Sequence, residues 1–127
     1  MRVYLDLCCL KRPFDRQDQP LVRLQTEAVL SLQALPSTVI AMVRSEAQLL
    51  ENSLNPVQSR REAVEVWLSQ DSVADLSETD LVHRIGELRA LGFSNFDAFH
   101  LASAELAGAA VFLTVDVSLL RVAARQP

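Results

Sequence analysis

Four carboxylates in this sequence stand at positions where short apolar runs end or helices are expected to begin. Asp6 and Asp116 each directly follow an apolar run, and Glu46 and Asp97 each fall in the expected first turn of a helix. Singly, such acids are often turn formers or favourable partners of a helix dipole. Gathered in one crevice they would repel and raise one another's pKa, so a divalent cation would stabilise the cluster. Oxygen ligands without His or Cys favour Mg²⁺ or Mn²⁺.

The elements that must position these acids alternate along the chain. Residues 2–5 (RVYL), 38–43 (TVIAMV) and 110–115 (AVFLTV) predict strands, and 72–76 is a weaker strand candidate. Helices are expected over 20–35, 45–54, 56–70, 77–91, 94–107 and 118–124, with residues 7–18 irregular. This alternation predicts an α/β fold in which a parallel sheet is covered on both sides.

In open parallel sheets the functional crevice lies beyond the carboxyl ends of the strands. Asp6, Glu46 and Asp116 follow three of the expected strands, so we expect them to meet at that edge. Asp97 precedes the last strand, in a helix start that favours negative charge, but its distance from the others does not follow from the sequence.

Length and composition predict one globular domain over residues 1–127. Half of the residues are hydrophobic and 22% are charged, which is typical of a packed globule. No apolar run is long enough for a membrane span and no signal sequence is recognisable, so we expect no membrane association and a cytoplasmic location. The adjacent Cys8 and Cys9 cannot join distant segments and are expected to be small buried residues.

The charge balance is compatible with a nucleic-acid substrate. Twelve basic and sixteen acidic residues give a net charge of −4, which argues against binding through a basic surface alone. Without the four candidate acids the balance is −4 + 4 = 0, and two bound divalent ions would have the same effect. A phosphodiester would then be attracted to the metal ions and to nearby arginines.

The order and spacing of these motifs resemble the PIN-domain ribonucleases. The resemblance rests on Asp6 after the first strand, the helix start at Ser45-Glu46, the helix over 97–102 (DAFHLA) and the strand end at 112–116 (FLTVD). Residues 7–15 (LCCLKRPFD) are similar to the loop after the first strand in one branch of VapC-type toxins. The similarity covers nearly the whole chain.

The resemblance implies a PIN-like three-layer α/β/α sandwich with a central, mostly parallel sheet. It also implies a divalent-metal-dependent endoribonuclease, the toxin of a toxin–antitoxin pair, which cleaves RNA and whose cognate antitoxin inserts a C-terminal segment into the pocket. By position, Asp6, Glu46, Asp97 and Asp116 become the catalytic, metal-binding quartet. A homodimer is expected as well.

Further residues are candidates for substrate or antitoxin contacts. They share a polar side chain near the expected mouth of the crevice: Lys11, Arg12, Arg44, His100 and Ser118. Two features depart from the family pattern. Val117 and Ser118 follow the last acid where relatives often carry another polar or acidic residue, and the chain stops at Pro127 where many continue into a final strand. These departures leave open a catalytically silent PIN-like module that binds another protein.

Overall fold

The computed structural model describes residues 1–127 and contains a three-stranded parallel sheet. The strands are β1 (Arg2–Leu5), β2 (Ala41–Val43) and β3 (Val111–Leu113), in the order β2-β1-β3. Val3 of β1 lies beside Met42 on one side and Val111 on the other. The predicted parallel sheet is confirmed, and each of the two outer strands is shorter than the apolar run that contains it.

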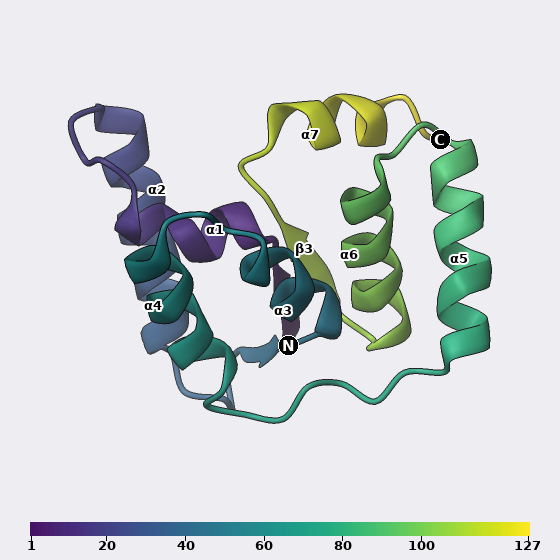
Figure 1. The fold of residues 1–127 in the computed structure, drawn as a ribbon, viewed down its shortest axis with the longest axis horizontal. Coiled ribbons are helices and arrows are strands. Elements are labelled where there is room, and N and C mark those ends of the chain that lie inside the picture. Colours follow the sequence, from purple (N-terminus) through teal and green to yellow (C-terminus); the bar gives the residue numbers. More distant parts are fainter.

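Helices connect and cover these strands (Figure 1). Their bounds are α1 (Leu7–Lys11), the 3-10 helix η1 (Arg12–Phe14), α2 (Pro20–Ala34), α3 (Glu46–Ser53), α4 (Gln58–Leu68), α5 (Glu78–Ala90), α6 (Asn95–Leu106) and α7 (Val117–Ala124). The predicted stops after α5 and α6 are confirmed, because Gly92 and Gly108 have positive φ angles of 109° and 75°, which favour glycine.

Two local predictions were wrong. Residues 7–14 are helical rather than irregular, because the Asp6 carboxylate accepts from the Leu7 N–H and caps α1. Residues 72–76 form no strand. In that segment only the Ala74 N–H is hydrogen-bonded to the backbone of another part of the chain, at the Arg44 carbonyl, and one such bond does not continue a ladder.

The two faces of the sheet are packed by different helices. Leu5, Met42 and Leu113 belong to a cluster that α1, α2 and α4 cover. The alternate residues Tyr4 and Phe112 pack against α6 on the opposite face. Figure 1 shows this division, with α1, α2 and α4 on one side of β3 and α6 and α5 on the other. The result is the expected three-layer α/β/α arrangement.

Each strand is followed by a helix, so the starts of α1, α3 and α7 lie at the same edge of the sheet. Hydrogen bonds fix this edge. Gln48 of α3 is fully buried and donates from Nε2 to the Leu5 carbonyl at 2.8 Å, and the Asp6 N–H donates to the Leu113 carbonyl at 2.9 Å. None of the helices has the combination of length and hydrophobicity that a membrane span requires.

Candidate metal centre

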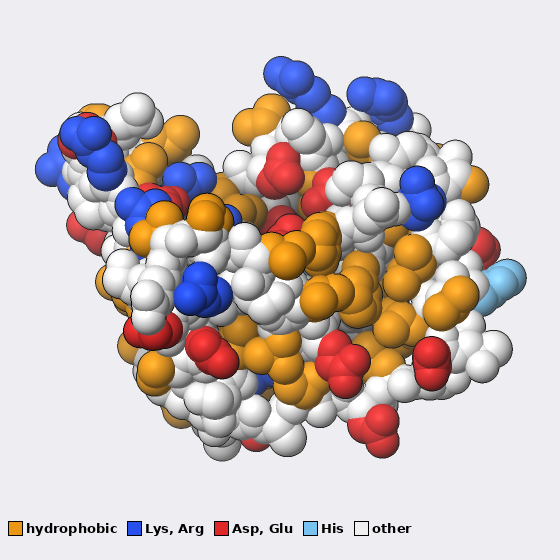
Figure 2. Space-filling model, viewed as in Figure 1, with side chains coloured by type: hydrophobic (Ala, Val, Ile, Leu, Met, Phe, Trp, Pro, Cys, Tyr) orange, Lys and Arg blue, Asp and Glu red, His pale blue; other side chains and the backbone are white.

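An acidic pocket of about 440 Å³ opens at the carboxyl edge of the sheet. Four carboxylates line it, those of Asp6, Glu51, Asp97 and Asp116, and Lys11 is its one basic residue. They come from the ends of β1 and β3 and from α3 and α6, so segments far apart in sequence supply them. Figure 2 shows carboxylates in the hollow beside α7.

Asp6 is the most rigidly held of these acids. Its side chain is almost fully buried, with one oxygen accepting from the Leu7 N–H at 2.9 Å. The other oxygen accepts from the Thr114 hydroxyl at 2.8 Å and lies 3.4 Å from the Cys8 sulfur. Thr114 and Cys8 therefore position the carboxylate, although the sequence analysis assigned them no part in the site. Of the two cysteines, only Cys9 is buried as expected, and Cys8 is half-buried.

The structure does not place Glu46 with the other predicted acids. Glu46 is exposed and lines a different cavity, while Glu51 of the same helix lines the acidic pocket. Five residues in a helix correspond to a rotation of about 140°, so the two side chains leave α3 in different directions. The buried face of α3 holds Ala47, Gln48 and Asn52. Glu51 lies three residues after Gln48, and this helical spacing was the signal that could have identified it.

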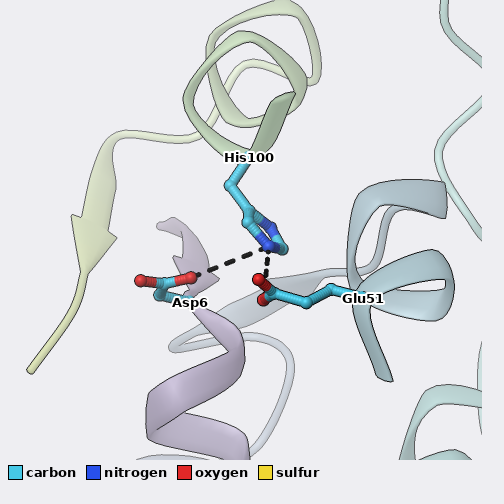
Figure 3. Close-up of side chains that lie close together, drawn as sticks. All are labelled: Asp6, Glu51 and His100. Atoms are coloured by element: carbon cyan, nitrogen blue, oxygen red, sulfur yellow. Dashed lines mark hydrogen bonds and ion pairs between the residues drawn. The ribbon is translucent and has the colours of Figure 1, made fainter. Parts of the chain in front are cut away.

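His100 of α6 lies close to two of these carboxylates. Its Nε2 atom is 3.0 Å from a carboxylate oxygen of Glu51 and 3.8 Å from one of Asp6 (Figure 3). Its Nδ1 atom lies 2.6 Å from the Tyr4 hydroxyl, and both rings are fully buried. The ligand atoms of Asp6, Glu51 and His100 all lie within 4.8 Å of one another.

The hydrogen bonds on the Nδ1 side of His100 favour one of its two tautomers. Ser45 accepts from the Gln48 N–H and lies 2.6 Å from the Tyr4 hydroxyl. Burial raises the pKa of Tyr4, so its hydroxyl keeps its proton. If the Ser45 hydroxyl donates to Tyr4 and the Tyr4 hydroxyl donates to Nδ1 of His100, each of these hydroxyl hydrogens has an acceptor. The remaining hydrogen of His100 is then on Nε2 and points to Glu51. We therefore assign His100 as a donor that orients Glu51 in the protein without metal. Because His100 is fully buried, it is not the substrate or antitoxin contact that was predicted.

Asp97 and Asp116 complete the pocket from two helix starts. Asp97 lies in the first turn of α6, which Ser94 caps, and Asp116 itself caps α7 by accepting from the Ser118 and Leu119 N–H groups. Burial raises the pKa of Asp97, the Ser94 hydrogen bond opposes this, and the charges of Asp116 and Asp6 raise it further. The pocket is therefore an environment with excess negative charge.

This donor set fits a hard divalent cation. The carboxylates of Asp6, Glu51, Asp97 and Asp116 line the pocket, and those of Asp6 and Glu51 already lie close enough to share an ion. The one nitrogen near them carries a hydrogen atom in the tautomer assigned above. Oxygen donors are the ligands of Mg²⁺ and Mn²⁺, and a cation would relieve the charge repulsion that adds to burial in raising the pKa of Asp97. The residues that would hold it are these four acids.

Only some of the other residues predicted to contact substrate or antitoxin lie at the pocket. Lys11 lines the pocket and Ser118 is exposed beside it, whereas Arg12 and Arg44 do not line it. Arg12 pairs with Asp15 at 3.2 Å. Arg44 is buried, stacks on the Trp67 ring at 3.9 Å and donates to the Trp67 carbonyl, so its guanidinium holds α4 to the end of β2.

The three-layer fold and the carboxylate pocket beyond its strands define the class of the protein, an α/β protein with a candidate metal centre. The sequence profile described as "PIN domain" matches residues 10–125, and the chain belongs to this family. PIN domains are generally nucleases and typically use divalent metals. The match includes Glu51, Asp97 and Asp116, and it begins after Asp6. Searches of curated proteins and of solved structures found no match.

Proposed function

We propose that this PIN domain is a divalent-metal-dependent endoribonuclease and the toxin of a toxin–antitoxin pair. The observation that carries the proposal is the pocket in which Asp6, Glu51, Asp97 and Asp116 converge at the carboxyl edge of the sheet. The family supports nuclease activity, and the acid-only donor set supports Mg²⁺ or Mn²⁺.

The residues of the chain divide the work in this proposal. Asp6 is fixed by Leu7 and Thr114, and Glu51 is oriented by His100, so both carboxylates would hold a cation. When bound, a divalent ion supplies positive charge that activates water and stabilises the leaving oxygen of a phosphodiester. One of the pocket carboxylates accepts the proton of the attacking water.

The electrostatics of the pocket bear on substrate binding. Four carboxylates around Lys11 repel a phosphodiester until cations neutralise them, so RNA binding and cation binding are coupled. Lys11 at the wall and Ser118 at the rim are the predicted contacts that remain available to a phosphate. Arg12 and Arg44 are engaged elsewhere and are no longer proposed for this role.

The toxin role rests on the similarity of residues 7–15 to VapC-type toxins, and these residues form α1 and η1 beside the pocket. A cognate antitoxin is proposed to insert a C-terminal segment whose basic side chains meet the pocket carboxylates. A homodimer and a cytoplasmic location complete the proposal.

The decisive test is calorimetric titration of Mn²⁺ into the metal-free protein near neutral pH, followed by Mn²⁺-dependent cleavage of a panel of structured RNAs. We expect saturable binding that Asp97→Asn weakens roughly tenfold or more, and cleavage that the same change abolishes. Asp80→Asn is a matched control, because Asp80 is exposed and stands three residues after the cap Ser77 of α5 as Asp97 does after Ser94 of α6. A folded protein that binds no Mn²⁺ would favour the catalytically silent binding module.

A further inference from the structure

A second cavity lies beside α3 and α6, the two helices that supply Glu51 and Asp97 to the acidic pocket. Its volume is about 590 Å³, and we call it the α3–α5 groove. Its lining combines the start of α3, the segment before α5 and parts of α5 and α6: Glu46, Val73, Ala74, Asp75, Leu76, Glu78, Leu81, Val82, Ile85, Phe99 and Ser103. In Figure 2 hydrophobic side chains spread over the face between α3 and α5, with carboxylates along their lower border.

The charges around the groove have one sign. Glu46, Asp75 and Glu78 are its only charged residues, all three are exposed, and none forms an ion pair with a basic residue of the chain. An apolar floor with unpaired carboxylates on its rim is complementary to an apolar group that carries a positive charge beside it. The same rim repels the phosphates of RNA.

One wall of the groove offers backbone groups. Within Val73–Leu76 the Ala74 N–H is bonded to the Arg44 carbonyl, and the remaining N–H and C=O groups are bonded to no other part of the protein. Unpaired backbone groups along an apolar groove are what an added peptide backbone requires. They favour a polypeptide over a small amphiphilic cation.

The floor of the groove contains a buried polar atom that the fold does not satisfy. Ser103 of α6 is 1% exposed, and its hydroxyl oxygen has no hydrogen-bond partner. Buried hydroxyls of folded proteins are usually paired, so this hydroxyl can bond a ligand or a water molecule that enters the groove. This observation is independent of the rim charges.

We propose that the α3–α5 groove binds an extended polypeptide segment of a partner protein. In this segment, apolar residues stand next to Lys or Arg. The apolar side chains enter between Val82 and the 73–76 segment, and the basic side chains meet Glu46, Asp75 and Glu78. This interaction surface is separate from the acidic pocket, so the proposal does not depend on nuclease activity.

The test is an unbiased selection of short random peptides displayed on phage against the immobilised full chain, followed by fluorescence anisotropy with the selected peptides. We expect enrichment of apolar residues next to Lys or Arg. Glu46→Gln/Glu78→Gln and Val82→Asp should each weaken binding roughly fivefold or more, and added salt should weaken it further.

Matched controls carry the same changes outside the groove. Glu27→Gln/Glu65→Gln removes two exposed charges from α2 and α4, and Val66→Asp alters a side chain that is 62% exposed, where Val82 is 64% exposed. These variants, and Asp97→Asn in the acidic pocket, should change peptide affinity less than about twofold. The proposal is overturned if no peptide is enriched, if the groove variants bind as the controls do, or if single-stranded RNA displaces the peptides.

Discussion

The acidic pocket and the α3–α5 groove both take residues from α3 and α6, and both contain several carboxylates, yet they differ in how those carboxylates are held. In the pocket, Asp6 is buried and fixed by neighbouring donors, and Glu51 faces the donor His100. In the groove, Glu46 and Glu78 are exposed and unpaired above an apolar floor. A candidate metal centre therefore differs from a charged rim because its carboxylates lie together and are held by hydrogen-bond donors. The number of acids does not distinguish the two.

The largest effect is expected from two glutamates of one helix. Glu51→Gln should weaken Mn²⁺ binding roughly tenfold to a hundredfold, because it removes an oxygen ligand from the pocket, whereas Glu46→Gln should change it less than about twofold. Both variants keep a good helix former in α3. Calorimetry on the two proteins in parallel measures the difference. Equal losses, or a larger loss for Glu46→Gln, would mean that the metal binds elsewhere.

A smaller effect on Mn²⁺ affinity is expected from a change at Tyr4, which contacts His100 and not the cation site. Tyr4→Phe keeps the ring that stacks on Phe112 at 5.3 Å but removes the hydroxyl that holds Nδ1 of His100. A hydrogen bond of this kind contributes about 0.5–1.5 kcal/mol, so we expect Mn²⁺ affinity to fall roughly threefold to tenfold.

A spectroscopic readout separates positioning from simple loss of stability. The imidazole nitrogen resonances of His100 report which nitrogen carries the hydrogen, and His83→Gln assigns them because the chain has two histidines. We expect hydrogen on Nε2 in the unmodified protein and a changed tautomer population in Tyr4→Phe. Hydrogen confined to Nδ1 in the unmodified protein would refute the donor role of His100 toward Glu51.

The sequence predicted the elements better than the partners of their side chains. The capping box of Ser45 with Gln48 located the start of α3 correctly, because capping is decided within one helical turn. The same local reasoning chose Glu46, the first acid of that helix, and missed Glu51, whose place depends on how α3 rotates against β1. Gln48 fixes that rotation through the Leu5 carbonyl, a contact between residues 43 positions apart.

Arg44 shows the same limit for cations. Its position after the second strand suggested a phosphate contact. In the structure its guanidinium stacks on and donates to Trp67, which lies 23 residues further along the chain. Asp6 and Asp116 were placed correctly beside each other because the ends of adjacent parallel strands must meet at one edge, which topology alone requires. Residues whose position follows from backbone topology were predictable, and those that depend on tertiary packing of side chains were not.

The smallest expected effect concerns stability without metal. Because the pKa of Asp97 in the folded protein is raised above its ordinary value, its contribution to the free energy of unfolding is present at low pH and is lost as pH rises through that pKa. Asp97→Asn carries no such penalty, so the difference in Tm, variant minus unmodified protein, should rise from near zero in acid to a positive plateau at neutral pH. Asp80→Asn, at the equivalent exposed position of α5, is the matched control. Thermal unfolding across this pH range measures both. Saturating Mn²⁺ should reverse the sign for Asp97→Asn, because the ion stabilises the unmodified pocket more than the variant pocket, which binds it more weakly. A Tm difference that does not change with pH would indicate that neither burial nor the neighbouring acids act on Asp97 as the structure implies.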